Sequence, residues 1–107
     1  MLTEAIYVAW ESFRGGGGTR PRGCSLHLTE EDADSFKQDY MKGLSRDERF
    51  TCPRPAMDYI AVFITESMYQ RIMFQKLANG KQGLRLEEEE ENKALEDKEI
   101  LFASDSS

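Results

Sequence analysis

The sequence predicts an α+β fold with two layers: a small, mostly antiparallel sheet of about four strands, with two helices on one face, in the order β-β-α-β-α-β. Three observations carry this prediction. Short runs rich in aromatic and β-branched residues are typical of strands, and two segments that begin with Thr-Glu have apolar residues at helical spacing. Glycine, proline or polar residues separate these segments. A chain of 107 residues with 39% hydrophobic residues is sufficient for one domain with a modest core.

The first two predicted strands form a hairpin. Residues 5–13 (AIYVAWESF) are aromatic and β-branched, which predicts a strand buried on most of both faces. Residues 24–28 (CSLHL) alternate between apolar and polar positions, as a strand with one covered face does. Cys24 and His27 therefore point to opposite faces of this second strand.

Two helices follow the same local pattern. We expect the first over residues 29–43, where Thr29 is a suitable N-cap, the acids after it complement the helix dipole, and Gly43 is a natural stop. The second is expected over residues 65–79, again with a threonine cap and an acid in the first turn. Each helix has an apolar stripe that can cover the sheet.

The remaining segments are two strands, a connector and a tail. Residues 59–64 (YIAVFI) are continuously apolar, which predicts a central strand. Residues 83–86 (GLRL) predict a short edge strand, at which copies of the chain could pair into a homo-oligomer. Residues 1–86 are then the domain, and residues 87–107 are an acidic tail that is either a frayed helix or disordered.

Charge and composition exclude several classes of function. The net charge is −6, and the tail carries all of it, with nine acids against two lysines, so the body is nearly neutral. Direct nucleic-acid binding is therefore disfavoured. No apolar run is long enough to span a bilayer, and the N-terminus lacks the features of a signal peptide. We expect a cytoplasmic protein with no membrane partner, in which Cys24 and Cys52 are half-buried thiols rather than a disulfide.

A stretch of four glycines flanked by arginines is the first candidate binding site. Glycine amides can converge on an anion, and guanidinium groups bind phosphate or carboxylate in a bidentate manner. The lysine of a P-loop is missing, and no frame fits G-x-G-x-x-G. A flexible hairpin tip and an engineered linker are the alternatives. The residues predicted to bind an anionic ligand are Arg14, Gly15, Gly16, Gly17, Gly18, Thr19, Arg20 and Arg22.

The acidic tail is the second candidate. One interpretation is a solvated end that aids solubility. The other is a segment that binds a basic surface of a protein partner, with an apolar anchor (EILFA) beyond the charges. The residues predicted to bind this partner are Glu87, Glu88, Glu89, Ile100, Leu101 and Phe102.

No catalytic or metal-binding constellation is predicted. Cys24 and His27 face opposite ways, so they cannot form a nucleophile–base pair or chelate one metal ion. His27 is more easily explained as a surface or sheet-face histidine. The acids lie in helix first turns and in the tail, where dipole complementation and solvation explain them. We therefore expect a protein that is not an enzyme and that needs no cofactor or metal.

The run RGGGGTRPRGCSLHLTEEDADSFKQDYMKGL, with the later YIAVFITESMYQRI and GLRL, resembles small uncharacterised accessory proteins of bacteriophages. The resemblance covers Tyr7 to Leu86. It implies a small cytosolic protein of an infected bacterium that blocks a host enzyme or sequesters a nucleotide signal used in defence. Two hypotheses result: a binding protein for a nucleotide-like or phosphorylated anion at the glycine–arginine loop, or an inhibitor of a host protein that uses the tail.

Overall fold

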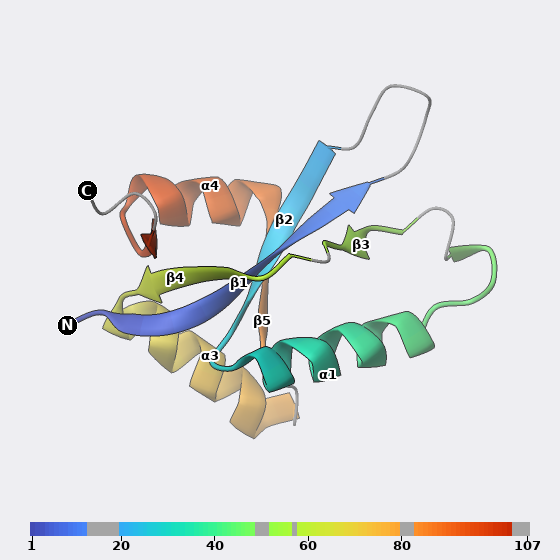
Figure 1. Cartoon of the computed structure of the whole chain (residues 1–107), viewed down its shortest axis with the longest axis horizontal. Coiled ribbons are helices and arrows are strands. Elements are labelled where there is room, and N and C mark those ends of the chain that lie inside the picture. Colours follow the sequence, from blue (N-terminus) through green and yellow to red (C-terminus); the bar gives the residue numbers. More distant parts are fainter. Residues whose placement is uncertain (13–19, 49–51, 57, 80–82, 104–107) are drawn as a thin grey trace.

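A computed structural model of the chain describes residues 1–12, 20–48, 52–56, 58–79 and 83–103. In these residues one antiparallel sheet of six strands is combined with three helices, which makes the fold α+β, as predicted (Figure 1). The strands are β1 (Thr3–Ser12), β2 (Arg20–His27), β3 (Arg54–Pro55), β4 (Ile60–Ile64), β5 (Leu84–Glu87) and β6 (Ile100–Phe102). The helices are α1 (Glu30–Lys42), α3 (Glu66–Asn79) and α4 (Glu88–Glu96).

The long strand β1 lies at the centre of the sheet. The strand order is β5-β2-β1-β4-β6, and the short β3 pairs with the end of β1. Tyr7 of β1 is opposite Leu26 of β2 on one side and Ile60 of β4 on the other. The register of β1 and β2 shifts at Trp10 and Glu11, as it does at a β-bulge. The two ends of the sheet are therefore β5 and β6.

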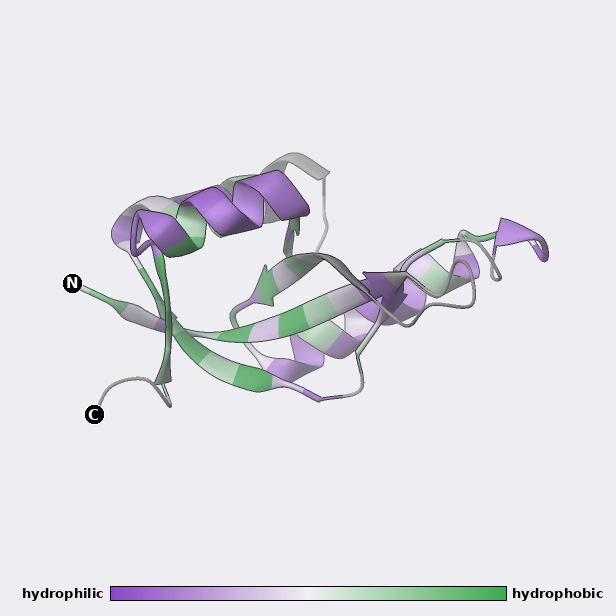
Figure 2. Ribbon diagram, turned by 90° about the horizontal axis from the view of Figure 1, so that it is seen from above, coloured by the Kyte–Doolittle hydropathy of each residue, from purple (hydrophilic) through white to green (hydrophobic). Residues whose placement is uncertain are grey.

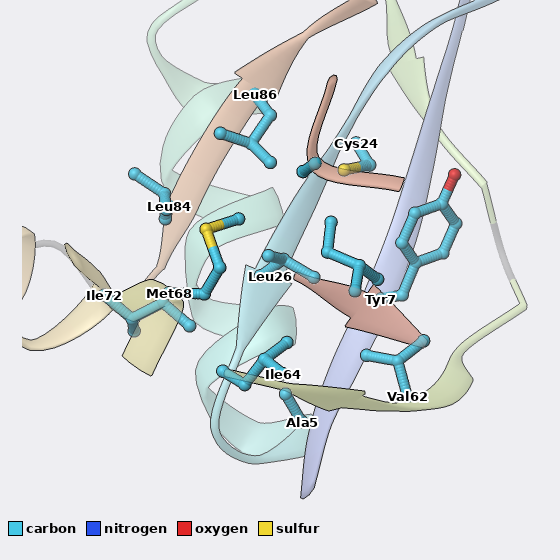
Figure 3. Packing of buried hydrophobic residues seen from close by; sticks show 12 residues of the cluster. Ala5, Tyr7, Cys24, Leu26, Val62, Ile64, Met68, Ile72, Leu84 and Leu86 are labelled. Atoms are coloured by element: carbon cyan, nitrogen blue, oxygen red, sulfur yellow. The ribbon is translucent and has the colours of Figure 1, made fainter. Parts of the chain in front are cut away.

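One face of the sheet forms the main hydrophobic core with α3 and α4. Alternate residues of β1 and β2 point to this side, and hydrophobic residues follow the strands while hydrophilic residues cover much of the helices (Figure 2). Figure 3 shows Met68 and Ile72 of α3 packed against the strand residues of this face. The buried members of the core are Ala5, Tyr7, Cys24, Leu26, Val62, Ile64, Met68, Ile72, Leu84, Leu86, Ala94 and Ile100.

Helix α1 covers the opposite face, so the prediction of both early helices on one face was wrong. Trp10 of β1 packs edge-to-face on Phe36 and Tyr40 of α1, with ring centroids 6.1 and 4.7 Å apart. His27 of β2 packs on Phe36 as well. These strand residues alternate with the core residues of the same strands, and α1 lies behind the strands in Figure 3. Because β1 is apolar on both faces, it needs a covering layer on each.

The strand and helix counts also differ from those predicted. The segment expected to be an acidic tail contains α4, with Ala94 buried, and β6, with Ile100 buried. The connector before β4 contains β3, whose Pro55 pairs with Trp10. The sheet therefore has six strands rather than about four, and α4 and β6 contribute residues to the core.

The predicted helix boundaries agree with the capping contacts. The backbone N–H of Asp32 donates to Thr29 Oγ1 at 3.1 Å, and the N–H of Gly43 donates to the carbonyl oxygen of Asp39 at 3.2 Å. The N–H of Met68 likewise donates to Thr65 Oγ1 at 3.4 Å. These threonines end the preceding loops and start α1 and α3.

The close approach of the backbones of β2 and β5 explains why residue 23 is a glycine. Gly23 of β2 has φ 132° and is paired with Glu87 of β5. A Cβ at this position would lie 2.2 Å from the carbonyl oxygen of Leu86. Only glycine therefore lets β5 pair with β2 along its full length.

Cys24 and Cys52 are free thiols, the first buried and the second half-buried. None of the helices in the described ranges is long and apolar enough to cross a membrane.

Candidate functional site

Most of the glycine–arginine stretch lies outside the described residues. This applies to Arg14, Gly15, Gly16, Gly17, Gly18 and Thr19. The backbones of Arg20 and Arg22 belong to β2, and Arg20 is paired with Ser12 of β1. The described ends of β1 and β2 project away from α3 and α4 (Figure 1). Anion binding at this loop stays a prediction.

The residues predicted to bind a partner through the C-terminal segment fall into two groups. Glu87 ends β5, and Glu88 and Glu89 begin α4, whereas Ile100, Leu101 and Phe102 form β6. Because β5 and β6 are the two ends of the sheet, the structure does not bring the glutamates and the apolar residues into one cluster.

The glutamates have a local structural role. The first turn of α4 contains Glu88 and Glu89, together with Glu90 and Glu91, next to the positive end of the helix dipole. The backbone N–H of Glu87 donates to Glu90 Oε1 at 3.5 Å, as in a capping box. Glu90 Oε2 also lies 3.6 Å from Arg71 Nη2 of α3. Helix capping, the helix dipole and one exposed ion pair give these acids a local role, and partner binding by Glu87, Glu88 and Glu89 stays a prediction.

An apolar hollow of about 650 Å³ runs along β6, and we call it the β6 groove. All its lining residues except Lys98 are apolar. Leu2 and Leu101 are 46% and 37% exposed, so two large apolar side chains of this hollow are open to solvent together. The lining residues are Leu2, Phe63, Leu95, Lys98, Ile100, Leu101 and Phe102.

A tight turn after α4 builds this groove. Lys98 adopts a left-handed backbone conformation with φ 59°, and the N–H of Glu99 donates to the carbonyl oxygen of Ala94 at 2.8 Å. The reversed chain then pairs with β4, where Leu101 is opposite Phe63. Phe102 packs edge-to-face on Tyr7, with ring centroids 5.1 Å apart. These contacts fix the strand and leave its outer edge to form the groove.

Two other hollows in the described part of the chain are more polar. One of about 570 Å³ lies beside α3 and is lined by Ser67, Gln70, Arg71, Met73, Phe74, Gln75 and Leu84. The other, of about 660 Å³, lies at the start of α4 and is lined by Pro53, Arg85, Glu87, Glu88, Glu89 and Glu90. Ligand sites are usually concave and mostly apolar, so the β6 groove is the best candidate of the three.

A buried polar cluster fastens α4 to the sheet. Glu91 of α4 is only 6% exposed, and Tyr7 Oη donates to its Oε2 at 2.5 Å. Burial is the largest cause that raises the pKa of Tyr7, and the hydrogen bond to Glu91 raises it further. Burial is also the largest cause that raises the pKa of Cys24, and the nearby Glu91 charge adds to it. Both groups therefore stay protonated at neutral pH, so they act as hydrogen-bond donors and not as nucleophiles.

A second buried polar cluster lies under α1. Trp10 Nε1 donates to Ser25 Oγ at 2.8 Å, and Ser25 Oγ lies 2.7 Å from His27 Nε2. This serine–histidine pair was not predicted from the sequence, although residues two apart on a strand share a face. Both side chains are fully buried, so no substrate can reach them. His27 is a sheet-face histidine, as one of the two predicted alternatives states, and it is not at the surface.

The described residues contain no group of three His, Cys, Asp or Glu side chains that could hold a metal ion. Comparison of the chain with protein-family models, with curated proteins and with solved structures gives no match. The β6 groove is thus identified from its own geometry alone.

Proposed function

We propose that this chain is a small, non-enzymatic binding protein whose β6 groove receives an extended, apolar segment of a protein partner. The observation that carries the proposal is the apolar hollow along β6, which is an end strand of the sheet in the described residues. An edge strand can accept a further strand through its backbone groups, while pockets beside it select the side chains.

The lining of the groove favours a strand as the occupant. Residues of a strand alternate between its two faces, so Leu101 points to the opposite face from Ile100 and Phe102. All three line the groove, which therefore runs around the edge of the sheet rather than over one face. An added strand has side chains on both of its faces and matches this shape.

Burial argues against catalysis in the described residues. The thiol of Cys24 and the Ser25–His27 pair are fully buried. Glu91 is 6% exposed and accepts a hydrogen bond from Tyr7. A general acid or base must reach the substrate within hydrogen-bond distance. Binding therefore explains the exposed β6 groove better than catalysis does. The resemblance to phage accessory proteins makes a bacterial host protein the first partner to test.

Short peptides can test the proposal directly. We expect hexapeptides with three successive branched or aromatic residues to bind saturably, and peptides with a central proline to fail, because proline blocks strand pairing. Fluorescence polarisation measures the affinity, and amide chemical shifts locate the site. The shifts should concentrate on Leu2, Phe63 and β6.

Two exposed residues provide a matched pair of variants. Leu101→Asp should weaken peptide binding at least about tenfold, because it places a charge in an apolar site. Phe74→Asp, at a residue of α3 that is 70% exposed and lies outside the groove, should leave the affinity unchanged. If no peptide of the panel binds, or if the shifts lie away from β6, the proposal is wrong.

A second proposal concerns the glycine–arginine loop. The backbones of Arg20 and Arg22 belong to the end of β2 that joins this loop, and guanidinium groups bind phosphate in a bidentate manner. Isothermal titration with a nucleotide panel should give binding that Arg20→Ala and Arg22→Ala each weaken by about tenfold. No heat change with the parent protein would refute this second proposal.

A further inference from the structure

We infer that, when no partner is bound, two copies of this chain pair antiparallel through β6, so that each copy fills the β6 groove of the other. The inference rests on the proposed function, because it uses the same groove. A second copy would then compete with a partner, and access to the groove would depend on protein concentration.

The two edges of the sheet differ in how they resist pairing. The β5 edge has Arg85 and Glu87 within the strand, and the glutamates of α4 follow directly. Charges at an edge are a common protection against pairing with another chain. The β6 edge has none within the strand, whose sequence is Ile-Leu-Phe, and one acid, Glu99, directly precedes it. The β6 edge, rather than the β5 edge that the sequence suggested, is therefore the one open to a second copy.

The sequence of β6 suits an interface on both faces. Ile100 is 1% exposed and packs in the core, so alternation would place a polar residue next to it. The next residue is instead Leu101, which is 37% exposed. A leucine at this position is explained when a second strand and its groove cover it.

A two-fold axis through the edge makes the contact self-complementary. In an antiparallel register centred on Leu101, this residue lies opposite its own copy, and Ile100 lies opposite Phe102 of the second copy. Each apolar residue of β6 then meets another apolar residue. The groove residues Phe63 and Leu95 can extend the contact beyond the three-residue strand.

The charge of the groove also permits self-association. The chain has a net charge of −6, so two copies repel each other on average. The lining of the β6 groove contains no carboxylate, and its one charged residue is Lys98. No ion pair of Lys98 occurs within the described residues. This face is consequently one on which two copies can approach without strong repulsion.

Sedimentation velocity over a range of concentrations tests the inference. We expect the parent chain to form dimers, Leu101→Asp to raise the dimer dissociation constant at least about tenfold, and Phe74→Asp to leave it unchanged. Circular dichroism confirms that each variant is folded. A parent chain that stays monomeric, or a dimer that Leu101→Asp does not weaken, overturns the inference.

A cross-linking variant tests the register without adding a charge. Residues directly opposite in an antiparallel pair have Cα atoms about 4.5–5.5 Å apart, which is within the range for a disulfide. Leu101→Cys, in a chain with Cys52→Ser, should therefore form a disulfide-linked dimer under mild oxidation. The same chain with Phe74→Cys in place of Leu101→Cys should not. An equal yield from both variants counts against pairing through β6.

These outcomes separate the inference from the proposed function. A monomeric chain that still binds the apolar peptides at β6 overturns the inference alone. A chain that neither dimerises nor binds the peptides overturns both. In a dimer of the inferred kind, saturating peptide should shift the sedimentation coefficient to that of the monomer, because the peptide and the second copy use one groove.

Discussion

Trp10→Ala should lower the free energy of unfolding by about 3–5 kcal/mol, as is typical of a buried tryptophan replaced by alanine. The side chain is fully buried between β1 and α1. It contacts Tyr40 at 4.7 Å between ring centroids, and the guanidinium of Arg85 lies 5.0 Å from its ring. Its indole also donates the hydrogen bond to Ser25. The variant loses this packing and leaves a cavity between the sheet and the helix.

Urea denaturation measures the effect, and Phe74→Ala is its control. Phe74 is also aromatic, but it is 70% exposed, so its truncation should change the free energy of unfolding by less than about 0.5 kcal/mol. Hydrogen exchange adds a local readout, since the amides of α1 should lose protection in Trp10→Ala before those of α3. A loss below about 1.5 kcal/mol would show that the α1 layer contributes little to stability.

The helices α1 and α3 could be predicted from the sequence because their signals are local. A threonine cap, an acid in the first turn and a glycine stop act within a few residues, and the caps form as expected. The strands β1, β2, β4 and β5 were likewise recognised from short runs of residues, though with shifted ends. Local chemistry was therefore sufficient to predict these six elements.

The layer arrangement depends on contacts between distant residues and was predicted wrongly. The first strand was expected to be apolar on both faces, and that expectation already requires a layer on each face. Placing both helices on one face left Trp10 and Val8 without cover, although both are fully buried. The apolar residues on both faces of β1 were thus the signal that could have placed α1 correctly.

The C-terminal segment was misjudged because its glutamates were treated alike. Glu88 and Glu89 are exposed, as a solvated segment requires, but Glu91 is buried against Tyr7. Charge alone cannot distinguish them, since the difference comes from a partner 84 positions away in the sequence. The apolar residues of β6 were noticed as a binding anchor, and they line the groove, whereas Glu87 belongs to the other edge.

Tyr7→Phe should lower the free energy of unfolding by about 2–3 kcal/mol, which is the usual contribution of a buried hydrogen bond to a charged group. The variant keeps the aromatic ring and its packing on Phe102. It removes only the hydroxyl that donates to Glu91, and so leaves a buried carboxylate with one donor fewer. Because Glu91 is on α4, the loss should loosen this helix and the turn that leads to β6.

A double-mutant cycle separates this hydrogen bond from general damage. Glu91→Leu alone leaves the Tyr7 hydroxyl buried without an acceptor, whereas the combined variant removes both polar groups. The combined variant should therefore lose less free energy of unfolding than the sum of the two single variants, by about 1–2 kcal/mol. Tyr59→Phe is the control: the Tyr59 hydroxyl donates to the exposed Asp34 and accepts from Lys37, so its removal should lower the free energy of unfolding by less than Tyr7→Phe does. Additive losses would mean that α4 is held by apolar packing of Ala94 and Leu95 instead. The β6 groove would then not depend on the Tyr7–Glu91 contact.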